Sequence, residues 1–239
     1  MGFPDWIFRK SILRTVSVRS SEFLSERAAS VQLVITSPPD LSESDCANWN
    51  QLFDLYESVF TRCVGVLAPD GVISVVVTNR KWKGAIVTKD ARIREILQNQ
   101  GMRLFAHKIL IRTLGVDLYR MCYSHLLCFW RKGEPGKYTS DYRARVFQSD
   151  IWGPFEKPHR VISNRNSFAP EVVKRLVLAF THPADLVLDP FCGTGTTQRV
   201  ALGLGRRAKG YETNADLRTS WQPCRLPKFY PALGRATRS

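Results

Sequence analysis

Apolar residues recur along the chain with two spacings, and together these predict strands that alternate with helices. Short apolar runs, or strict alternation of apolar and polar positions, predict seven strands, over residues 12–18, 31–35, 71–78, 103–112, 123–131, 186–188 and 208–212. Helical spacing predicts helices over 50–67, 90–101, 171–180 and 198–204, with a further short candidate over 21–29 that Ser21 could cap. The Pro69-Asp70-Gly71 run predicts a turn that closes the first long helix. This order favours an α/β fold in which a mostly parallel seven-stranded sheet carries helices on both faces.

Composition divides the 239 residues into one large domain and two atypical segments. We predict a single domain over 1–214, which is long enough to bury a substantial core. Residues 132–158 lack periodicity and are rich in Gly, Pro, Lys, Arg, Tyr and Trp, which indicates an irregular insert and a candidate substrate-recognition region. Residues 215–239 form a basic, aromatic tail that either follows a phosphate backbone or drapes over the surface. No apolar run approaches the ~20 residues that a membrane-spanning helix requires.

The chain carries a large excess of positive charge and a scattered set of cysteines. Lys and Arg number 35 against 21 Asp and Glu, a formal net charge of +14, which indicates a polyanionic partner, most simply nucleic acid. The six cysteines include no Cys-x-x-Cys pair and there are only four histidines, which argues against a metal site and for reduced thiols. We therefore expect an intracellular protein, in the cytoplasm or at the nucleoid. A basic, serine-containing stretch between Asp5 and Glu22 leaves organelle import as a weaker alternative.

The stretch from Asp189 to Thr197 has the pattern of a ligand-binding turn. A short apolar strand precedes it and a helix follows, so that free backbone N–H groups are presented at the helix N-terminus. Gly193 and Gly195 allow positive φ and a close approach of a ligand to the backbone. A second strand ends in Glu212, roughly 20 residues after the turn, which is the distance at which such folds bind ribose hydroxyls.

The Thr36-Ser37-Pro38-Pro39 stretch ends another buried strand. Two prolines cannot continue a central strand, so we expect a rigid turn at the carboxyl edge of the sheet, where open α/β sheets bind ligands. The serine hydroxyl and the backbone carbonyls are acceptors that could orient an aromatic amine and favour a nucleophilic, tetrahedral nitrogen. A rigid loop without chemistry is the alternative interpretation.

Together the two stretches resemble the exocyclic-amine nucleic-acid methyltransferases, which use S-adenosylmethionine as cofactor. The catalytic motif comes first and the cofactor motif last, as in the beta group of that family, and the resemblance covers residues 31–214. It implies a Rossmann-like class I methyltransferase fold with permuted motif order. It also implies catalytic roles for Ser37, Pro38 and Pro39, and we add Asp40 to this catalytic set because it directly follows them. The residues that it assigns to the cofactor are Thr36, Asn166, Ser167, Phe168, Asp189, Phe191, Gly193, Thr194, Gly195 and Glu212.

Three departures from the family pattern concern the substrate and the adenine of the cofactor. Asp40 stands where the family has an aromatic residue that stacks on the displaced base, Val18-Arg19-Ser20-Ser21 replaces a Gly-Asp pair, and the recognition region is short. We predict that Asp40 reads the substrate through its carboxylate. Other aromatic residues could replace the missing ring, the candidates being Trp49, Trp130, Tyr138, Tyr142 and Trp152.

The resemblance implies transfer of a methyl group to a base amino group without a metal. A serine before the two prolines favours cytosine N4 over adenine N6, and we favour DNA over RNA as the substrate. A catalytically inactive subunit that binds nucleic acid is the alternative, because Asp40 and the missing Gly-Asp pair depart from the family pattern. The sequence leaves the oligomeric state open.

Overall fold

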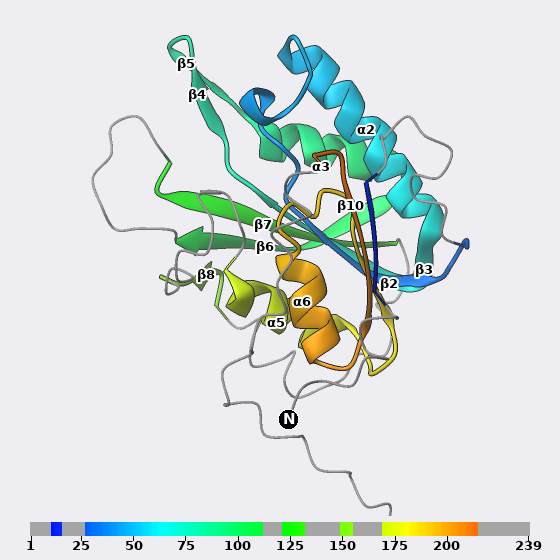
Figure 1. Cartoon of the computed structure of the whole chain (residues 1–239). Helices are drawn as coiled ribbons and strands as arrows, with labels where there is room; N and C mark the ends of the chain where they lie inside the picture. The colour runs from blue at the N-terminus through cyan, green and yellow to red at the C-terminus, as the bar shows by residue number, and fades with distance from the viewer. Residues whose placement is uncertain (1–10, 16–26, 112–120, 132–148, 155–168, 215–239) are drawn as a thin grey trace, which may run out of the picture.

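An eight-stranded sheet with the strand order β1-β10-β9-β2-β3-β7-β6-β8 forms the centre of the structure (Figure 1). The structure is a computed structural model that describes residues 11–15, 27–111, 121–131, 149–154 and 169–214. The strands of this sheet are β1 Ser11–Thr15, β2 Val31–Thr36, β3 Leu67–Val77, β6 Met102–Ile111, β7 Tyr123–Arg131, β8 Ile151–Trp152, β9 Leu186–Asp189 and β10 Arg207–Glu212. The helices are α2 Trp49–Val66, α3 Lys89–Asn99, α5 Pro170–Phe180 and α6 Thr196–Gly203, with a short 3₁₀ turn, η1, at Leu41–Glu43.

The predicted fold class is confirmed, and each of the seven predicted strands is present. The strands β1, β10, β9, β2 and β3 pair in parallel, whereas β7 runs antiparallel to both β3 and β6. The additional strand β8 has two residues and lies within the predicted insert, where it pairs with β6. The rest of the insert, residues 132–148 and 155–158, and the predicted tail over 215–239 lie outside the described residues.

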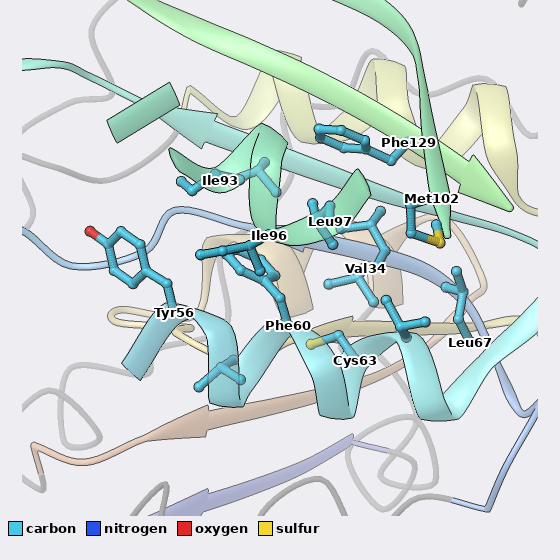
Figure 2. Close-up of a cluster of buried hydrophobic side chains, with 14 of the residues drawn as sticks. Val34, Tyr56, Phe60, Cys63, Leu67, Ile93, Ile96, Leu97, Met102 and Phe129 are labelled. Carbon is cyan, nitrogen blue, oxygen red and sulfur yellow. The ribbon is translucent and has the colours of Figure 1, made fainter. Parts of the chain in front are cut away.

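Helices cover both faces of the sheet, and each face has its own apolar core. Alternation along β2 produces this division, because Val34 points into one core and Leu33 and Ile35 point into the other. The first core lies under α2 and α3, and Figure 2 shows Val34 there beside Phe60 of α2 and Leu97 of α3. The second core lies under α5 and α6, which pack against the opposite face (Figure 1).

The ends of the helices follow from local chemistry. The side chain of Asn48 accepts a hydrogen bond from the Gln51 N–H and so caps the start of α2. The helix α5 begins with Pro170, whose fixed φ suits the first helical position. The helix α6 begins after Gly195, which has a left-handed φ of 76°.

Two local predictions differ from the structure. The turn expected at Pro69-Asp70-Gly71 is wrong as an element boundary, because β3 begins at Leu67, directly after α2. The pairing of β3 with β2 shifts there, so that Pro69 and Asp70 are an exposed bulge within the strand. Of the short helix predicted over 21–29, residues 21–26 lie outside the described residues, and residues 27–30 form a turn with φ of 57° at Ala29.

A separate two-stranded hairpin follows β3, a feature that the sequence analysis left unassigned. It consists of β4 Arg80–Trp82 and β5 Ala85–Val87, which pair antiparallel. Figure 1 shows it extending from the body of the protein beyond the sheet, near the N-terminal part of α2. None of the helices in the described ranges is long and apolar enough to span a membrane.

Candidate active site

Three adjacent strands end in residues that the sequence analysis assigned to the site. The strand β2 ends at Thr36, β9 at Asp189 and β10 at Glu212, and these strands are neighbours in the order β10-β9-β2. Because they are parallel, their carboxyl ends meet at one edge of the sheet. The fold thus brings together two chemical stretches whose members Thr36 and Asp189 are 153 positions apart in the chain.

A buried carboxylate joins the two stretches. Asp189 is 1% exposed, and its Oδ1 accepts hydrogen bonds from the Thr36 hydroxyl at 2.7 Å and from the Phe191 N–H at 3.1 Å. Its Oδ2 accepts one from the Thr197 hydroxyl at 2.8 Å, in the first turn of α6. Burial raises the pKa of Asp189 to about 6, although the three hydrogen bonds act in the opposite direction. Both oxygens are occupied by protein groups, so the structure gives Thr36 and Asp189 a positioning role, and their direct contact with a cofactor stays a prediction.

The glycine turn is held open by its backbone. Gly193 and Gly195 have φ of 48° and 76°, the left-handed region that favours glycine. The Cys192 N–H donates to the Tyr211 carbonyl at 2.9 Å, and the Gly195 N–H donates to the Cys192 carbonyl at 2.8 Å. Among the described residues no atom lies within 4 Å of the position that a Cβ on Gly193 would take, so the turn presents open space there. Burial raises the pKa of the Cys192 thiol, which disfavours the thiolate form.

The Glu212 carboxylate closes one side of this turn. Its Oε2 accepts a hydrogen bond from the Gly193 N–H at 2.9 Å, and its Oε1 accepts one from the Asn214 N–H at 2.9 Å. The side chain is partly exposed, whereas Asp189 is enclosed. A partly exposed carboxylate beside an open glycine turn has the right chemistry to accept hydrogen bonds from ribose hydroxyls. Together, Glu212 and the turn fit the cofactor that the sequence analysis expected.

The Pro-Pro turn is fixed from outside by α2. The Tyr56 hydroxyl donates to the Pro39 carbonyl at 2.5 Å, and Tyr56 is fully buried. Burial raises the pKa of Tyr56, which keeps the hydroxyl protonated and able to donate. Ser37 is partly exposed, and the structure records no hydrogen bond between the Ser37 hydroxyl or the Pro38 carbonyl and another described residue. Pro38 is itself buried, and the orientation of a ligand amine by these two acceptors stays a prediction.

Asp40 is engaged by protein groups. Its Oδ1 accepts a hydrogen bond from the Leu41 N–H at 2.8 Å, and it caps η1 together with Glu43. Its Oδ2 lies 3.5 Å from the Lys89 ammonium and 3.8 Å from Nε of Arg80. Lys89 is buried, and burial lowers its pKa although the nearby Asp40 carboxylate acts in the opposite direction. The acid is therefore a built part of the turn, and its reading of a substrate stays a prediction.

The aromatic residues suggested as a replacement platform differ in their surroundings. Trp152 is 2% exposed and lies in the core under α5, and Trp130 stacks on Phe105 with ring centroids 3.7 Å apart. Trp49 is partly buried at the start of α2. The two tyrosines, Tyr138 and Tyr142, lie outside the described residues.

Several predicted residues are untested, and some structural partners were not predicted. The cofactor residues Asn166, Ser167 and Phe168 lie outside the described residues, as does the stretch Val18–Ser21. Phe191 packs against the core under α2, and the Thr194 carbonyl accepts a hydrogen bond from Arg199.

The unpredicted partners are Tyr56, Lys89 and Thr197. The available signals were a hydroxyl on the apolar face of a helix, a lysine before an aspartate at a helix start, and the second of two threonines that follow the glycine turn.

A metal centre is not formed by the described part of the chain. Within the ranges that the structure describes, no group of three or more His, Cys, Asp and Glu side chains is arranged to hold a metal ion. His107 and His125 form a pair at 2.9 Å, with Asn79 at 3.4 Å from the second ring.

Comparison with protein families and curated proteins gives matches over most of the chain. Residues 31–220 match the model of a family described as DNA methylase, the N6 and N4 methyltransferases. The type II methyltransferase M.BglII of Bacillus subtilis is 27% identical over 219 residues, which cover 77% of this chain and 60% of that protein. M.MjaI of Methanocaldococcus jannaschii is 37% identical over 107 residues, which cover 38% of this chain and 35% of that protein. The chain thus spans less than two thirds of the length of these curated relatives.

Solved structures show the same fold. The PvuII DNA methyltransferase, described as cytosine-N4-specific, superposes with a TM-score of 0.71 at 18% identity, covering 88% of this chain and 84% of that one. TTHA0409 of Thermus thermophilus, complexed with S-adenosyl-L-methionine, superposes with a TM-score of 0.69 at 24% identity, covering 87% of this chain and 90% of that one.

Proposed function

Because the chain belongs to the DNA methylase family, whose model its residues 31–220 match, we propose that it methylates an exocyclic amino group of a DNA base with S-adenosylmethionine. The observation that carries the proposal is the Asp189 carboxylate, which accepts hydrogen bonds both from Thr36 at the end of β2 and from Thr197 in the first turn of α6, directly after the glycine turn. This link sets the amine-orienting acceptors and the cofactor turn at one sheet edge, as transfer between two bound molecules requires.

The cofactor, when bound, supplies an electrophilic methyl group on a sulfonium. In this proposal the partly exposed Glu212 carboxylate binds the ribose hydroxyls, and the open turn at Gly193 and Gly195 lets the backbone lie close to the ligand. The hydrogen bond from the Gly193 N–H already fixes the orientation of Glu212 before any ligand arrives.

The target amine is oriented by Ser37 and Pro38. Its lone pair is conjugated into the ring and is a poor nucleophile until acceptors engage both N–H bonds and favour a tetrahedral nitrogen. The Ser37 hydroxyl and the Pro38 carbonyl are those acceptors in our proposal, and the bond from Tyr56 to Pro39 holds the turn that carries them. The base must leave its stack to reach this edge.

Cytosine N4 is the favoured amine, and DNA is the favoured nucleic acid. A serine precedes Pro38-Pro39 in this chain, where the adenine-N6 subgroup usually has an acid or an amide. The matched family is one of DNA methylases, which favours DNA over RNA.

Incubation with methyl-labelled cofactor and separate DNA and RNA pools, followed by nucleoside analysis, tests the function. We expect label in DNA as N4-methylcytosine, and we expect Ser37→Ala to lower the single-turnover rate roughly 100-fold while cofactor binding persists. Ser30→Ala is the matched control, because Ser30 precedes the opposite end of the same strand. A folded wild-type protein that binds cofactor and labels neither pool would contradict the enzyme and favour an inactive nucleic-acid-binding subunit. Label found as N6-methyladenine would contradict the choice of cytosine but not the proposed methyltransferase activity.

A further inference from the structure

The hairpin of β4 and β5 is an exposed, basic element beside the candidate active site. Residues 80–87 read Arg-Lys-Trp-Lys-Gly-Ala-Ile-Val, with three cations and no acid. The turn lies at Lys83 and Gly84, whose φ values of 46° and 80° are both left-handed, as two-residue hairpin turns require. The residues from Arg80 to Ile86 are all exposed. Figure 1 shows that this hairpin projects from the body of the protein, and its three cations therefore lie on a projecting element.

The base of the hairpin is closed by hydrogen bonds and lies next to the candidate site. At its start, Nε of Arg80 lies 3.8 Å from Oδ2 of Asp40, directly after the Pro-Pro turn. Asn79, just before β4, donates from Nδ2 to Oδ1 of Asp90 at 2.7 Å and accepts from the Asp90 N–H at 3.2 Å. Asp90 belongs to α3, which follows β5, so these bonds close the base of the hairpin. A ligand held at the Pro-Pro turn would therefore lie near the hairpin.

Trp82 presents an aromatic surface on this basic element. It is one of the large apolar residues on the described surface, with 41% of the residue exposed. Its ring meets that of Trp49 of α2 edge to face, with centroids 6.0 Å apart and planes at 81°. This contact orients the indole without burying it. Lys81 and Lys83 flank Trp82 in sequence and are exposed, and an aromatic ring near exposed cations is the combination with which proteins bind unpaired nucleic-acid bases and their phosphates.

We propose that the β4–β5 hairpin binds the DNA substrate beside the target base, with Trp82 contacting an unstacked base and Lys81 and Lys83 contacting phosphates. The inference rests on the proposed function for the identity of its ligand. Charge complementarity favours a nucleic acid as the occupant, because the hairpin has no acidic residue and the whole chain carries a net charge of +14, and the proposed function makes that nucleic acid DNA. Trp82 supplies an aromatic face at an edge where Asp40 offers only a carboxylate.

Binding of a fluorescein-labelled, random-sequence DNA duplex and of its single strand, together with steady-state methyl transfer, tests the inference. We expect Trp82→Ala to weaken binding and raise KM for DNA roughly 5- to 150-fold, the range that loss of a stacking ring produces. Trp82→Phe retains a ring and should recover most of the loss. Ile86→Ala is the matched control for the hairpin's stability, because Ile86 is 53% exposed on the other strand but not aromatic. Cofactor affinity should stay at the wild-type value in all three variants.

A second pair of variants tests the phosphate contacts. Lys81→Gln with Lys83→Asn should reduce the slope of log affinity against log salt by about two, one for each cation lost. Asparagine is chosen because it tolerates the left-handed φ at position 83. Arg103→Gln is the control, because Arg103 is exposed near the amino end of β6 and should leave the slope unchanged.

The two proposals fail in different ways. If the wild-type protein transfers methyl groups but the Trp82 and lysine variants match their controls within twofold, the hairpin inference is wrong and the proposed function stands. If the wild type transfers none, the proposed function fails, and the hairpin is judged from duplex and single-strand binding alone. The mass of the protein in solution is a further check. If the wild type is an oligomer, Trp82→Ala is a monomer and the affinity for DNA is unchanged, the hairpin docks a second copy of this chain and the inference is overturned. The inference would also be overturned if Trp82→Ala weakened binding to an RNA pool but left binding to DNA unchanged.

Discussion

The buried Asp189 allows a prediction about how stability depends on pH. Burial raises its pKa to about 6 from an ordinary value of 3.8, so the folded protein holds this proton more tightly than the unfolded chain does. The stability that this proton contributes is complete below pH 3.8 and is lost as the pH rises through 6. A difference of about two pH units, at about 1.4 kcal/mol a unit, amounts to about 3 kcal/mol over the whole range.

The change to test is Asp189→Asn, which keeps the size of the side chain but removes its titration. Between pH 5 and pH 7.5, loss of this proton should lower the free energy of unfolding of the wild type by about 1.4 kcal/mol. The wild type should therefore exceed the variant in free energy of unfolding by about 1.4 kcal/mol more at pH 5 than at pH 7.5. At pH 7.5 the variant should still be less stable, by about 1–3 kcal/mol, because the amide leaves donors such as the Thr36 and Thr197 hydroxyls poorly matched.

Urea unfolding of both proteins at the two pH values measures these differences, because the comparison cancels every other titrating group. Asp54→Asn, at an exposed position of α2, is the control for replacing a carboxylate by an amide. A gap between wild type and Asp189→Asn that stays constant, or that widens towards pH 7.5, would refute the reasoning that a desolvated acid links the two stretches.

Two further predictions concern the packing around the site. Tyr56→Phe removes the donor to the Pro39 carbonyl and should lower the free energy of unfolding by about 1–2 kcal/mol, with a fall in kcat and little change in cofactor affinity; unchanged stability and kcat would show that the bond does not hold the turn. Gly210→Ala should destabilise by about 1–3 kcal/mol, because its Cβ would lie 2.2 Å from Nε2 of the buried Gln198. Gly65→Ala is the opposite case in the same urea assay, since a Cβ there meets no described atom within 4 Å, and this helix position should gain about 0.5–1 kcal/mol; equal effects of the two changes would contradict the packing argument.

The order and type of the strands could be predicted from the sequence, because each one buries an apolar run. The runs at 31–35 and 71–78 stand next to turn signals, and both became neighbouring central strands. The hairpin at 80–87 was missed for the opposite reason. It is short, exposed and basic, so it has no apolar pattern, and its turn uses Lys83 in a left-handed conformation where Asn or Asp would have given a signal.

The site could be predicted where a residue type is demanded by backbone geometry or by position at a strand end. Gly193, Gly195 and Glu212 are of this kind, and the structure places them together. The partners that hold the site rigid could not be predicted in this way. In the sequence, Tyr56 is one of the apolar residues on the buried face of a helix, and this packing role is enough to explain it. Only the fold shows that its hydroxyl reaches the Pro39 carbonyl. Lys89 could not be predicted either, because its role depends on an ion pair with Asp40, which lies far away in the chain.

The link between Thr36 and Asp189 also has a consequence during synthesis of the chain. The strand β2 has β3 on one side from early on, but its other neighbour, β9, is made last but one among the described strands of the sheet. At about 5–20 residues per second, the 153 positions between Thr36 and Asp189 take roughly 8–30 s to translate. Throughout that interval β2 is an open, strongly apolar edge that could pair with another nascent chain. The strand that brings Asp189 to Thr36 is thus also the one that covers this edge and ends the period of greatest risk of aggregation.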